Sequence, residues 1–249
     1  GKVARSVIAV WLSFLFFSFW QAPIPAVNEP HWLAKAKNYW HPDWCAGDFF
    51  LESSNTHLVF YQTVGALTAV FSFELTALIG RVLGYLLLAF GWVSLCRSAT
   101  GKRETALPAA WLFLLLASIG NLSGEWLVSG IEGKVFSYAF MFLSLARLGE
   151  SDWLRAGLYG GLGIAFHPLV GIWFAIAVGM AIAIAAVVPG RGRLSLDDLS
   201  STIRQPLAIA GLVTLIGVSL FGVVPAFQGI GGASPQVAFT PTYLQVFFR

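Results

Sequence analysis

Long apolar runs recur along this chain, and short polar segments separate them. A helix needs about 20 apolar residues to cross the hydrocarbon core of a bilayer. Only 11% of the residues are charged and 57% are hydrophobic, whereas soluble domains carry about 25% charged residues. The sequence therefore predicts an all-α, polytopic membrane protein whose partner is the lipid bilayer. Its seven predicted transmembrane helices are residues 7–20, 74–96, 107–119, 135–148, 154–166, 169–188 and 206–224.

Several of these predicted helices are shorter than a full span, which is typical of tilted or broken helices in a packed bundle. One of them, residues 154–166, contains four glycines: Gly157, Gly160, Gly161 and Gly163. Small residues allow the backbones of membrane helices to approach each other closely. We therefore expect this helix to pack against a neighbouring helix through its glycines.

The first polar segment, residues 28–52, is rich in titratable groups for so apolar a chain. It contains His31, His41 and four of the twelve acidic residues, which are Glu29, Asp43, Asp48 and Glu52. Within it, residues 31–40 carry tryptophan and tyrosine at helical spacing, which is typical of a helix lying on a membrane surface. Residues 57–71 are apolar but too short for a comfortable span, so they predict either a further span or a second surface helix.

The positive charges decide between these two interpretations, because cytoplasmic loops of membrane proteins are enriched in lysine and arginine. If residues 57–71 do not cross, ten of the fifteen basic residues fall on one side of the membrane. These are Lys2, Arg5, Arg97, Lys102, Arg103, Arg147, Arg155, Arg191, Arg193 and Arg204. We therefore expect a cytoplasmic N-terminus, an external first loop with two surface helices, and all four histidines on the external side.

This topology gives one transmembrane module over residues 1–249. Residues 1–22 are its first transmembrane helix, 23–73 the external loop, 74–225 six further helices, and 226–249 the start of the next external loop. The last residues end without a terminal signal, so we expect the module to be truncated at its C-terminus. The basic residues are scattered between apolar segments and form no patch, which argues against a nucleic-acid partner.

Three carboxylates of the first loop are candidate catalytic residues: Glu29, Asp43 and Asp48. Glu29 follows the first helix at the edge of the bilayer, where a low dielectric makes a carboxylate a usable general base. It could equally act as a capping acid before the surface helix. His41 and Asp43 could hold a divalent cation such as Mg²⁺ or Mn²⁺, although the same residues also suit tight turns.

Four further residues are candidates for binding an anionic substrate: Lys134, Arg81, His167 and His31. Lys134 opens a predicted helix, where free N–H groups favour phosphate, but it could instead pair with Glu132. Arginines inside membrane helices usually face a bundle or cavity, so Arg81 predicts either a structural pair with an acid or an anion site. His167 precedes a proline and could cap a helix or line a cavity.

Four short motifs carry a resemblance to a known class. They are Asn28-Glu29-Pro30, residues 41–48 (HPDWCAGD), Glu132-Gly133-Lys134 and residues 166–169 (FHPL), and they look like motifs of bacterial membrane proteins with the same layout. A first span, a long external loop that begins with an acid, and six further spans resemble the GT-C superfamily of integral-membrane glycosyltransferases. The family's first-loop acid is often aspartate or an Asp-Glu pair, whereas this chain has Asn28-Glu29.

The resemblance implies an enzyme of a bacterial inner membrane that transfers a sugar from a polyprenyl-phosphate donor at the external face. The first-loop acid, here Glu29 with Asp43 or Asp48 as alternates, would be the general base or would help to hold a metal. Lys134 and Arg81 would stabilise the departing phosphate. Two other classes fit the same residues: a transporter or flippase of an anionic lipid, and a non-catalytic membrane scaffold.

Overall fold

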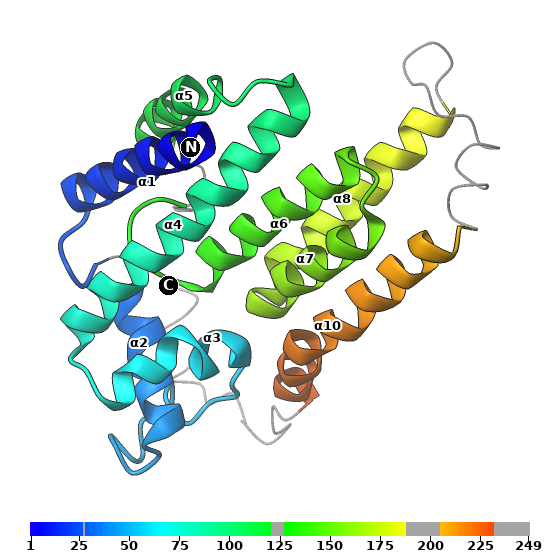
Figure 1. The fold of residues 1–249 in the computed structure, drawn as a ribbon. Coiled ribbons are helices and arrows are strands. Elements are labelled where there is room, and N and C mark those ends of the chain that lie inside the picture. Colours follow the sequence, from blue (N-terminus) through cyan, green and yellow to red (C-terminus); the bar gives the residue numbers. More distant parts are fainter. Residues whose placement is uncertain (27, 121–126, 188–204, 232–249) are drawn as a thin grey trace, which may run out of the picture.

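The computed structural model describes residues 1–26, 28–120, 127–187 and 205–231, and in these ranges the chain folds into helices without strands (Figure 1). The predicted all-α class is therefore confirmed. The helices are α1 (Lys2–Gln21), α2 (Glu29–Trp40), α3 (Leu58–Gln62), the 3₁₀ helix η1 (Val64–Ala69), α4 (Phe73–Thr100), α5 (Ala106–Ile119), α6 (Gly133–Gly149), α7 (Trp153–Phe166), α8 (Pro168–Val187) and α10 (Pro206–Gly231).

Each of the seven predicted apolar runs forms a helix. Four helices are long and apolar enough to cross a membrane, namely Val3–Gln21, Phe73–Thr100, Pro168–Ala185 and Pro206–Gln228. The other three, α5, α6 and α7, have 14, 17 and 14 residues. The chain is thus a helical protein with several candidate membrane-spanning segments, and the total of seven spans stays a prediction. Residue 188 and the basic residues Arg191, Arg193 and Arg204 lie outside the described ranges.

Two helix boundaries differ from those predicted. We expected an external loop from residue 226, but α10 continues through Pro225 to Gly231, because a proline inside a helix can kink it, at the loss of one backbone hydrogen bond, without ending it. Residues 57–71 form two short helices, α3 and η1, that meet at Thr63. A Cβ at Gly65 would lie 2.6 Å from the Ala36 Cβ, so the broken segment packs closely on α2.

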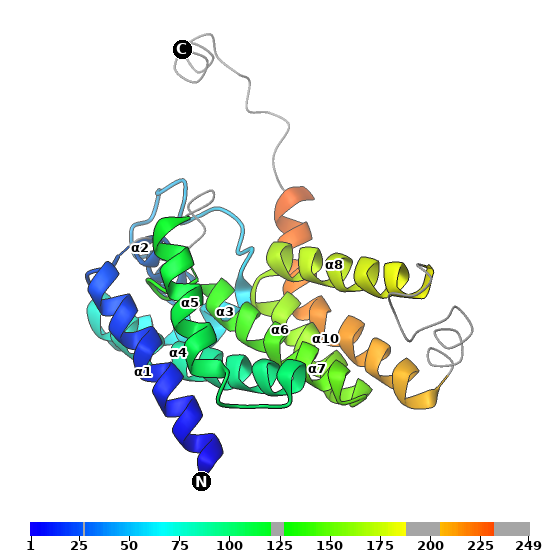
Figure 2. The same cartoon turned by 90° about the horizontal axis from the view of Figure 1, so that it is seen from above.

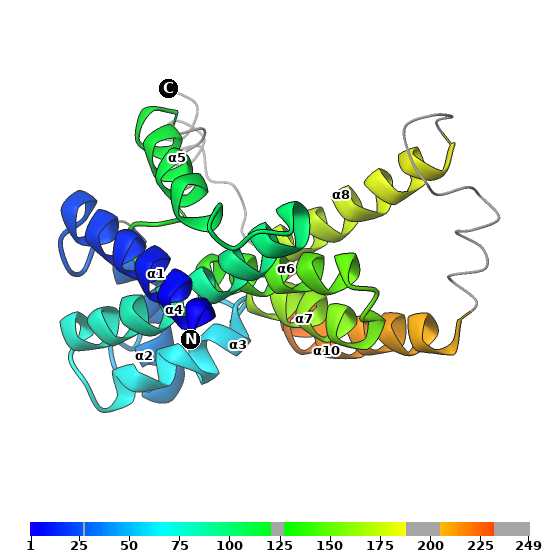
Figure 3. The ribbon, with the colours of Figure 1, turned by 45° about the horizontal axis from the view of Figure 1, so that its top comes forward.

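The helices form a row in which α4 packs on α1 and α6, α6 packs on α7, and α7 packs on α10. Figures 1 and 2 show α1, α4 and α5 on one side and α8 and α10 on the other. In Figure 3, α8 and α10 both extend away from α7, and the distance between them increases along their length. Buried side chains of α1, α4 and α6 form the core. Among them are Phe14, Tyr85 and Val135.

The glycines of α7 are the contact surface that we expected. A Cβ at Gly157 would lie 1.9 Å from the Gly211 carbonyl oxygen of α10, and one at Gly161 would lie 2.7 Å from the Val218 Cβ. On another face, a Cβ at Gly163 would lie 3.2 Å from the Ser137 carbonyl oxygen of α6. The prediction of direct backbone packing through these glycines is confirmed.

Candidate functional site

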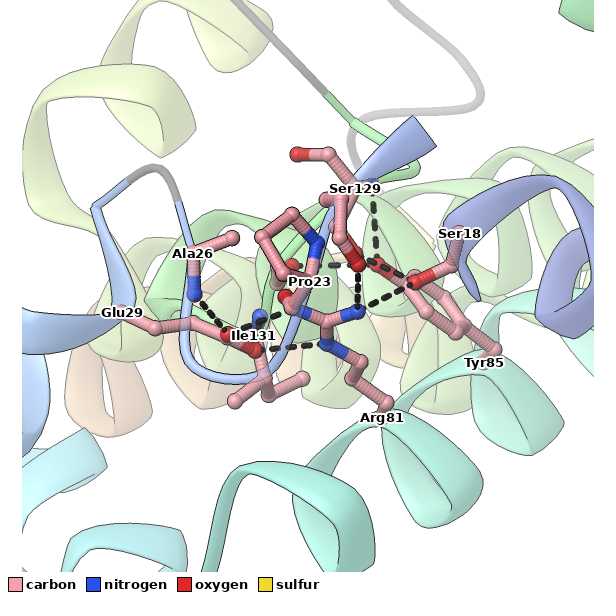
Figure 4. Close-up of polar contacts among 10 residues, drawn as sticks. Ser18, Pro23, Ala26, Glu29, Arg81, Tyr85, Ser129 and Ile131 are labelled. Carbon is pink, nitrogen blue, oxygen red and sulfur yellow. Dashed lines mark hydrogen bonds and ion pairs between the residues drawn. The ribbon is translucent and has the colours of Figure 1, made fainter. Parts of the chain in front are cut away.

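A buried ion pair joins the first turn of α2 to the third turn of α4. The Arg81 guanidinium contacts the Glu29 carboxylate through two parallel bonds, Nε to Oε1 at 2.8 Å and Nη2 to Oε2 at 2.6 Å. Neither side chain is exposed to solvent. Figure 4 shows the two groups facing each other between the end of α1 and α4. This bidentate geometry is the strongest arrangement for an arginine and a carboxylate.

Backbone groups complete the coordination of both charges. The Ala26 N–H donates to Glu29 Oε2 at 2.7 Å, and the Ile131 N–H donates to Oε1 at 2.6 Å. Arg81 donates to the Ala22 carbonyl at 3.0 Å and the Pro23 carbonyl at 2.7 Å. Buried charges are tolerated when they are paired and hydrogen-bonded in this way. The pair therefore fixes the chain after α1 and the segment before α6 against α4.

Tyr85, one turn along α4, holds the same segment. Its hydroxyl donates to the Gly130 carbonyl at 3.0 Å and accepts from the Ser129 N–H at 2.9 Å. Ser18 of α1 donates to the Ser129 carbonyl and accepts from Arg81. Residues 129–131 are thus held by three side chains that come from separate helices, which places the next residues, 132–134, in a defined position.

The structure brings the predicted acid and the predicted arginine together. Arg81 pairs with an acid, as one of our two interpretations required, and that acid is Glu29 from 52 residues earlier in the chain. Both Glu29 oxygens accept hydrogen bonds and both face the protein interior. This arrangement suits a residue that positions the segment before Glu132 better than one that contacts a substrate.

A second buried ion pair lies at the start of α6. Lys134 Nζ is 2.8 Å from Glu132 Oε1, and both side chains are less than a tenth exposed. The Asn28 amide donates to Glu132 Oε2 at 3.3 Å. A Cβ at Gly133, between the two charges, would lie 2.7 Å from the Phe166 carbonyl oxygen and 2.8 Å from the Trp32 ring. Lys134 therefore forms the pair with Glu132 that was one of its two predicted roles.

Two histidines lie beside Trp32, whose ring is close to Gly133. The His57 ring centroid is 4.7 Å from that of His167 and 4.3 Å from that of Trp32. His167 Nδ1 accepts a 3.4 Å hydrogen bond from the Val170 N–H in the first turn of α8, which is the predicted helix cap. Burial, and secondarily the charge of His167, lowers the pKa of His57 from its ordinary value to about 3. His57 is therefore neutral at physiological pH.

A cavity opens beside His57, between α2, α3 and the loop before α3. Its volume is about 270 Å³. Its lining combines aromatic rings with polar and basic groups: Asn28, His31, Trp32, Lys35, Phe50, Ser53, Ser54, Thr56, His57 and Tyr61. His31 is exposed there, and its ring meets that of Phe50 edge-on at 5.7 Å. Its predicted role as a substrate contact stays a prediction. Ligand sites in proteins combine an apolar lining with a few convergent polar groups in this way.

Lys35 fixes one wall of the cavity. Its ammonium donates to the carbonyls of Phe50, Leu51 and Ser53, at 3.1 Å and 2.6 Å for the first two. Burial lowers the pKa of Lys35, and the charge of Asp48 partly opposes this shift. The ligating carbonyl oxygens carry no formal charge, so the Lys35 charge at the cavity wall is compensated only in part, by Asp48.

We expect Lys35→Met to lower the free energy of unfolding by about 2–3 kcal/mol, because hydrogen bonds to a charged group are worth that much. Residues 41–56 should also become sensitive to limited proteolysis. Lys37→Met is the matched control: its ammonium lies over the Trp44 and Phe73 rings at 4.9 and 5.3 Å, a contact worth only about 0.5–1 kcal/mol. Equal effects of the two variants would contradict a specific role of Lys35 in the loop.

The remaining predicted residues lie on the loop after α2. His41, Asp43 and Asp48 are exposed, and Asp48 Oδ1 accepts a 2.9 Å hydrogen bond from the Leu51 N–H. Glu52 similarly accepts from the Gly47 N–H, so these two acids stabilise turns. In the described ranges no three histidine, cysteine, aspartate or glutamate side chains gather as metal ligands. The metal site at His41 and Asp43 stays a prediction.

The sequence alone did not single out Trp32, His57 and Tyr61 as site residues. Trp32 was visible only as part of an amphipathic stripe, and His57 only as the start of an apolar run. Ser18 and Tyr85 lie within apolar helices, where nothing local distinguishes a polar side chain that reaches another segment. Comparison of the chain with protein-family models, curated proteins and solved structures finds no match.

Proposed function

We propose that this chain is the membrane module of a glycosyltransferase that uses a polyprenyl-phosphate sugar donor bound at the cavity between α2 and α3. The composition of the cavity carries the proposal. The rings of Trp32 and Tyr61 offer apolar faces beside the Asn28 amide and the hydroxyls of the loop before α3. A sugar presents the same mixture of apolar faces and hydroxyl groups, and aromatic residues with a polar edge suit such surfaces.

The charge at the cavity favours an anionic donor. Lys134 and Glu132 neutralise each other at 2.8 Å, and His57 is uncharged at neutral pH because of its low pKa. The Lys35 ammonium is ligated by neutral carbonyls and supplies a positive charge. Lysine acts on phosphate as a point charge, so in this proposal Lys35 favours an anionic donor through its charge alone, while its N–H groups remain bonded to the loop carbonyls.

The position of the cavity suits a lipid-linked substrate. Helices α2 and η1 pack against α4, which is a candidate membrane span. The isoprenoid chain of a donor would remain in the bilayer while its sugar reaches the cavity. In this proposal the layer of α2, α3 and η1 lies on the external face of a bacterial inner membrane, the N-terminus is cytoplasmic, and all seven predicted helices cross, as the resemblance to the GT-C superfamily implies.

The structure favours a division of roles that differs from our first expectation. Glu29 and Arg81 position the segment before Glu132, and His31 is the general base, since it is exposed in the cavity and imidazole is the commonest proton acceptor in catalysis. The acceptor hydroxyl attacks the anomeric carbon, His31 takes the hydroxyl proton, and the bond from the anomeric carbon to the phosphate oxygen breaks. The lipid phosphate leaves with that electron pair, and the anomeric configuration inverts.

The test is sugar transfer by the full chain in proteoliposomes that contain a radiolabelled polyprenyl-phosphate sugar and a lipid-extract acceptor. His31→Gln should lower the rate about 100-fold, the usual contribution of a general base, with donor binding and unfolding unchanged. Trp32→Ala should weaken donor binding about tenfold through lost ring contact. Trp173→Ala on the exposed face of α8 is the matched control and should leave both unchanged.

The outcomes separate the competing classes. Donor movement across the bilayer without a new glycosidic bond would identify a flippase. Donor binding that requires Trp32 but gives no product with any acceptor would indicate a non-catalytic scaffold. Wild-type transfer by His31→Gln would remove His31 as the base and return that role to Asp43 or Asp48.

A further inference from the structure

A second pocket lies near the opposite end of α4 from the α2 and α3 layer. Ser6, Arg97, Gly101, Arg103 and Glu104 line it, and its volume is about 360 Å³. The 28 residues of α4 extend about 42 Å at 1.5 Å per residue. The pocket is therefore distant from the candidate functional site, and what it binds does not depend on the function proposed there.

Cations outnumber carboxylates around this pocket. Arg97 and Arg147 both donate to Glu150, each at 2.6 Å, so one carboxylate serves two guanidinium groups. Arg103 in the lining and Lys102 beside it add two positive charges, and Glu104 adds one negative charge. The lining itself thus has two arginines and one carboxylate, and Lys102, Arg147 and Glu150 are linked to these residues by sequence or through ion pairs. Each arginine has five N–H donors in a planar fork, so Arg97 keeps donors that Glu150 does not use.

The walls of the pocket are the ends of two candidate membrane spans. Ser6 is near the start of the segment Val3–Gln21, and Arg97 is in the last turn of Phe73–Thr100. Gly101 ends α4 with a φ of +72°, a left-handed conformation that glycine adopts at little cost, and this turn brings residues 101–105 over the pocket. If both segments cross a bilayer, the pocket lies at the depth of the lipid phosphates.

From this combination we infer that the pocket binds the phosphate of an anionic lipid headgroup. Arg97 and Arg103 approach the phosphate from the two sides of the Gly101 turn, and a guanidinium matches two phosphate oxygens at once. The acyl chains of the lipid lie along α1 and α4, whose outward faces carry exposed apolar side chains such as Ile8, Leu12 and Phe90. Basic pockets between membrane helices bind lipid headgroups in this manner.

Native mass spectrometry of the full chain, released from nanodiscs of equal parts phosphatidylglycerol and phosphatidylcholine, tests the inference. The wild-type protein should retain phosphatidylglycerol preferentially. Arg97→Gln/Arg103→Gln should reduce this preference about 30-fold, and Arg103→Gln alone, which leaves the bonds to Glu150 intact, about fivefold. The matched control is Arg155→Gln, since Arg155 is near the same end, is 63% exposed and pairs only with Asp152 among the residues described.

A second arm adds millimolar inorganic phosphate to the lipid-bound protein. Displacement of the lipid identifies a site for phosphate as such, and retention identifies a site for the intact lipid headgroup. Either result supports the assigned chemistry. An unchanged lipid preference in Arg103→Gln and in the double variant, with folding shown by circular dichroism, overturns it, and so does an equal loss in Arg155→Gln.

Discussion

Glu29→Gln is expected to lower the free energy of unfolding by about 3–5 kcal/mol, because removing one partner of a buried ion pair leaves the other charge uncompensated. Arg81 would then remain inside the protein with neutral partners alone. Arg81→Met should cost a similar amount. The double variant Glu29→Met/Arg81→Met should lose less than the sum of the two, since neither charge remains. Denaturant unfolding in detergent, followed by tryptophan fluorescence, measures all three.

The exposed pair of Arg155 and Asp152 is the control for this cycle. Its atoms are 3.2 Å apart and the Arg155 side chain is 63% exposed, so Asp152→Asn should cost no more than about 1 kcal/mol. The comparison of the single and double variants also distinguishes a structural role of Glu29 from a catalytic one. Normal stability of Glu29→Gln together with abolished sugar transfer would make Glu29 the general base and would contradict its role as a positioning residue.

Gly157→Val is expected to detach α10 from α7. The new Cβ would lie 1.9 Å from the Gly211 carbonyl oxygen, and a backbone atom cannot turn aside as a side chain can. We expect a loss of at least about 3 kcal/mol, the upper part of the range for overpacking. The same denaturant series measures the loss, and limited proteolysis of α10 should show that this helix is released first.

Gly217→Val on α10 provides the matched control. Nothing lies within 4 Å of the position that its Cβ would take, so the same substitution in the partner helix should change stability by less than about 0.5 kcal/mol. Similar losses in Gly157→Val and Gly217→Val would mean that helix propensity, and not the close contact with α7, determines the effect.

The sequence predicted those parts of the fold that depend on local composition. Seven apolar runs became helices in the described ranges because long apolar segments at helical spacing favour a helix, and four of these helices are long enough to cross a membrane. The glycine contacts of α7 were also predictable, since four small residues within seven positions have few other uses inside an apolar helix. The predicted end of α10 near Pro225 was wrong, because a proline alone does not show whether a helix continues beyond it.

The candidate site was harder to predict because its contacts are tertiary. The position of Arg81 inside an apolar helix suggested that it pairs with an acid, but the sequence did not identify which acid. The actual partner, Glu29, reaches Arg81 only after the chain turns back at the end of α1. Similarly, His57 and His167 are 110 positions apart, and nothing in either local sequence indicates that their rings lie 4.7 Å from each other.

The position of Glu29 also affects how the chain enters the membrane. An arginine in the middle of an apolar segment raises the cost of its insertion by roughly 2.5–3.5 kcal/mol. Glu29 is 52 residues before Arg81, so the ribosome has already added it to the chain when α4 is made. The Glu29 carboxylate, which neutralises Arg81, is therefore already part of the growing chain when Arg81 is added. Loss of Glu29 should therefore reduce the yield of inserted α4 during biogenesis, before any property of the finished protein is measured.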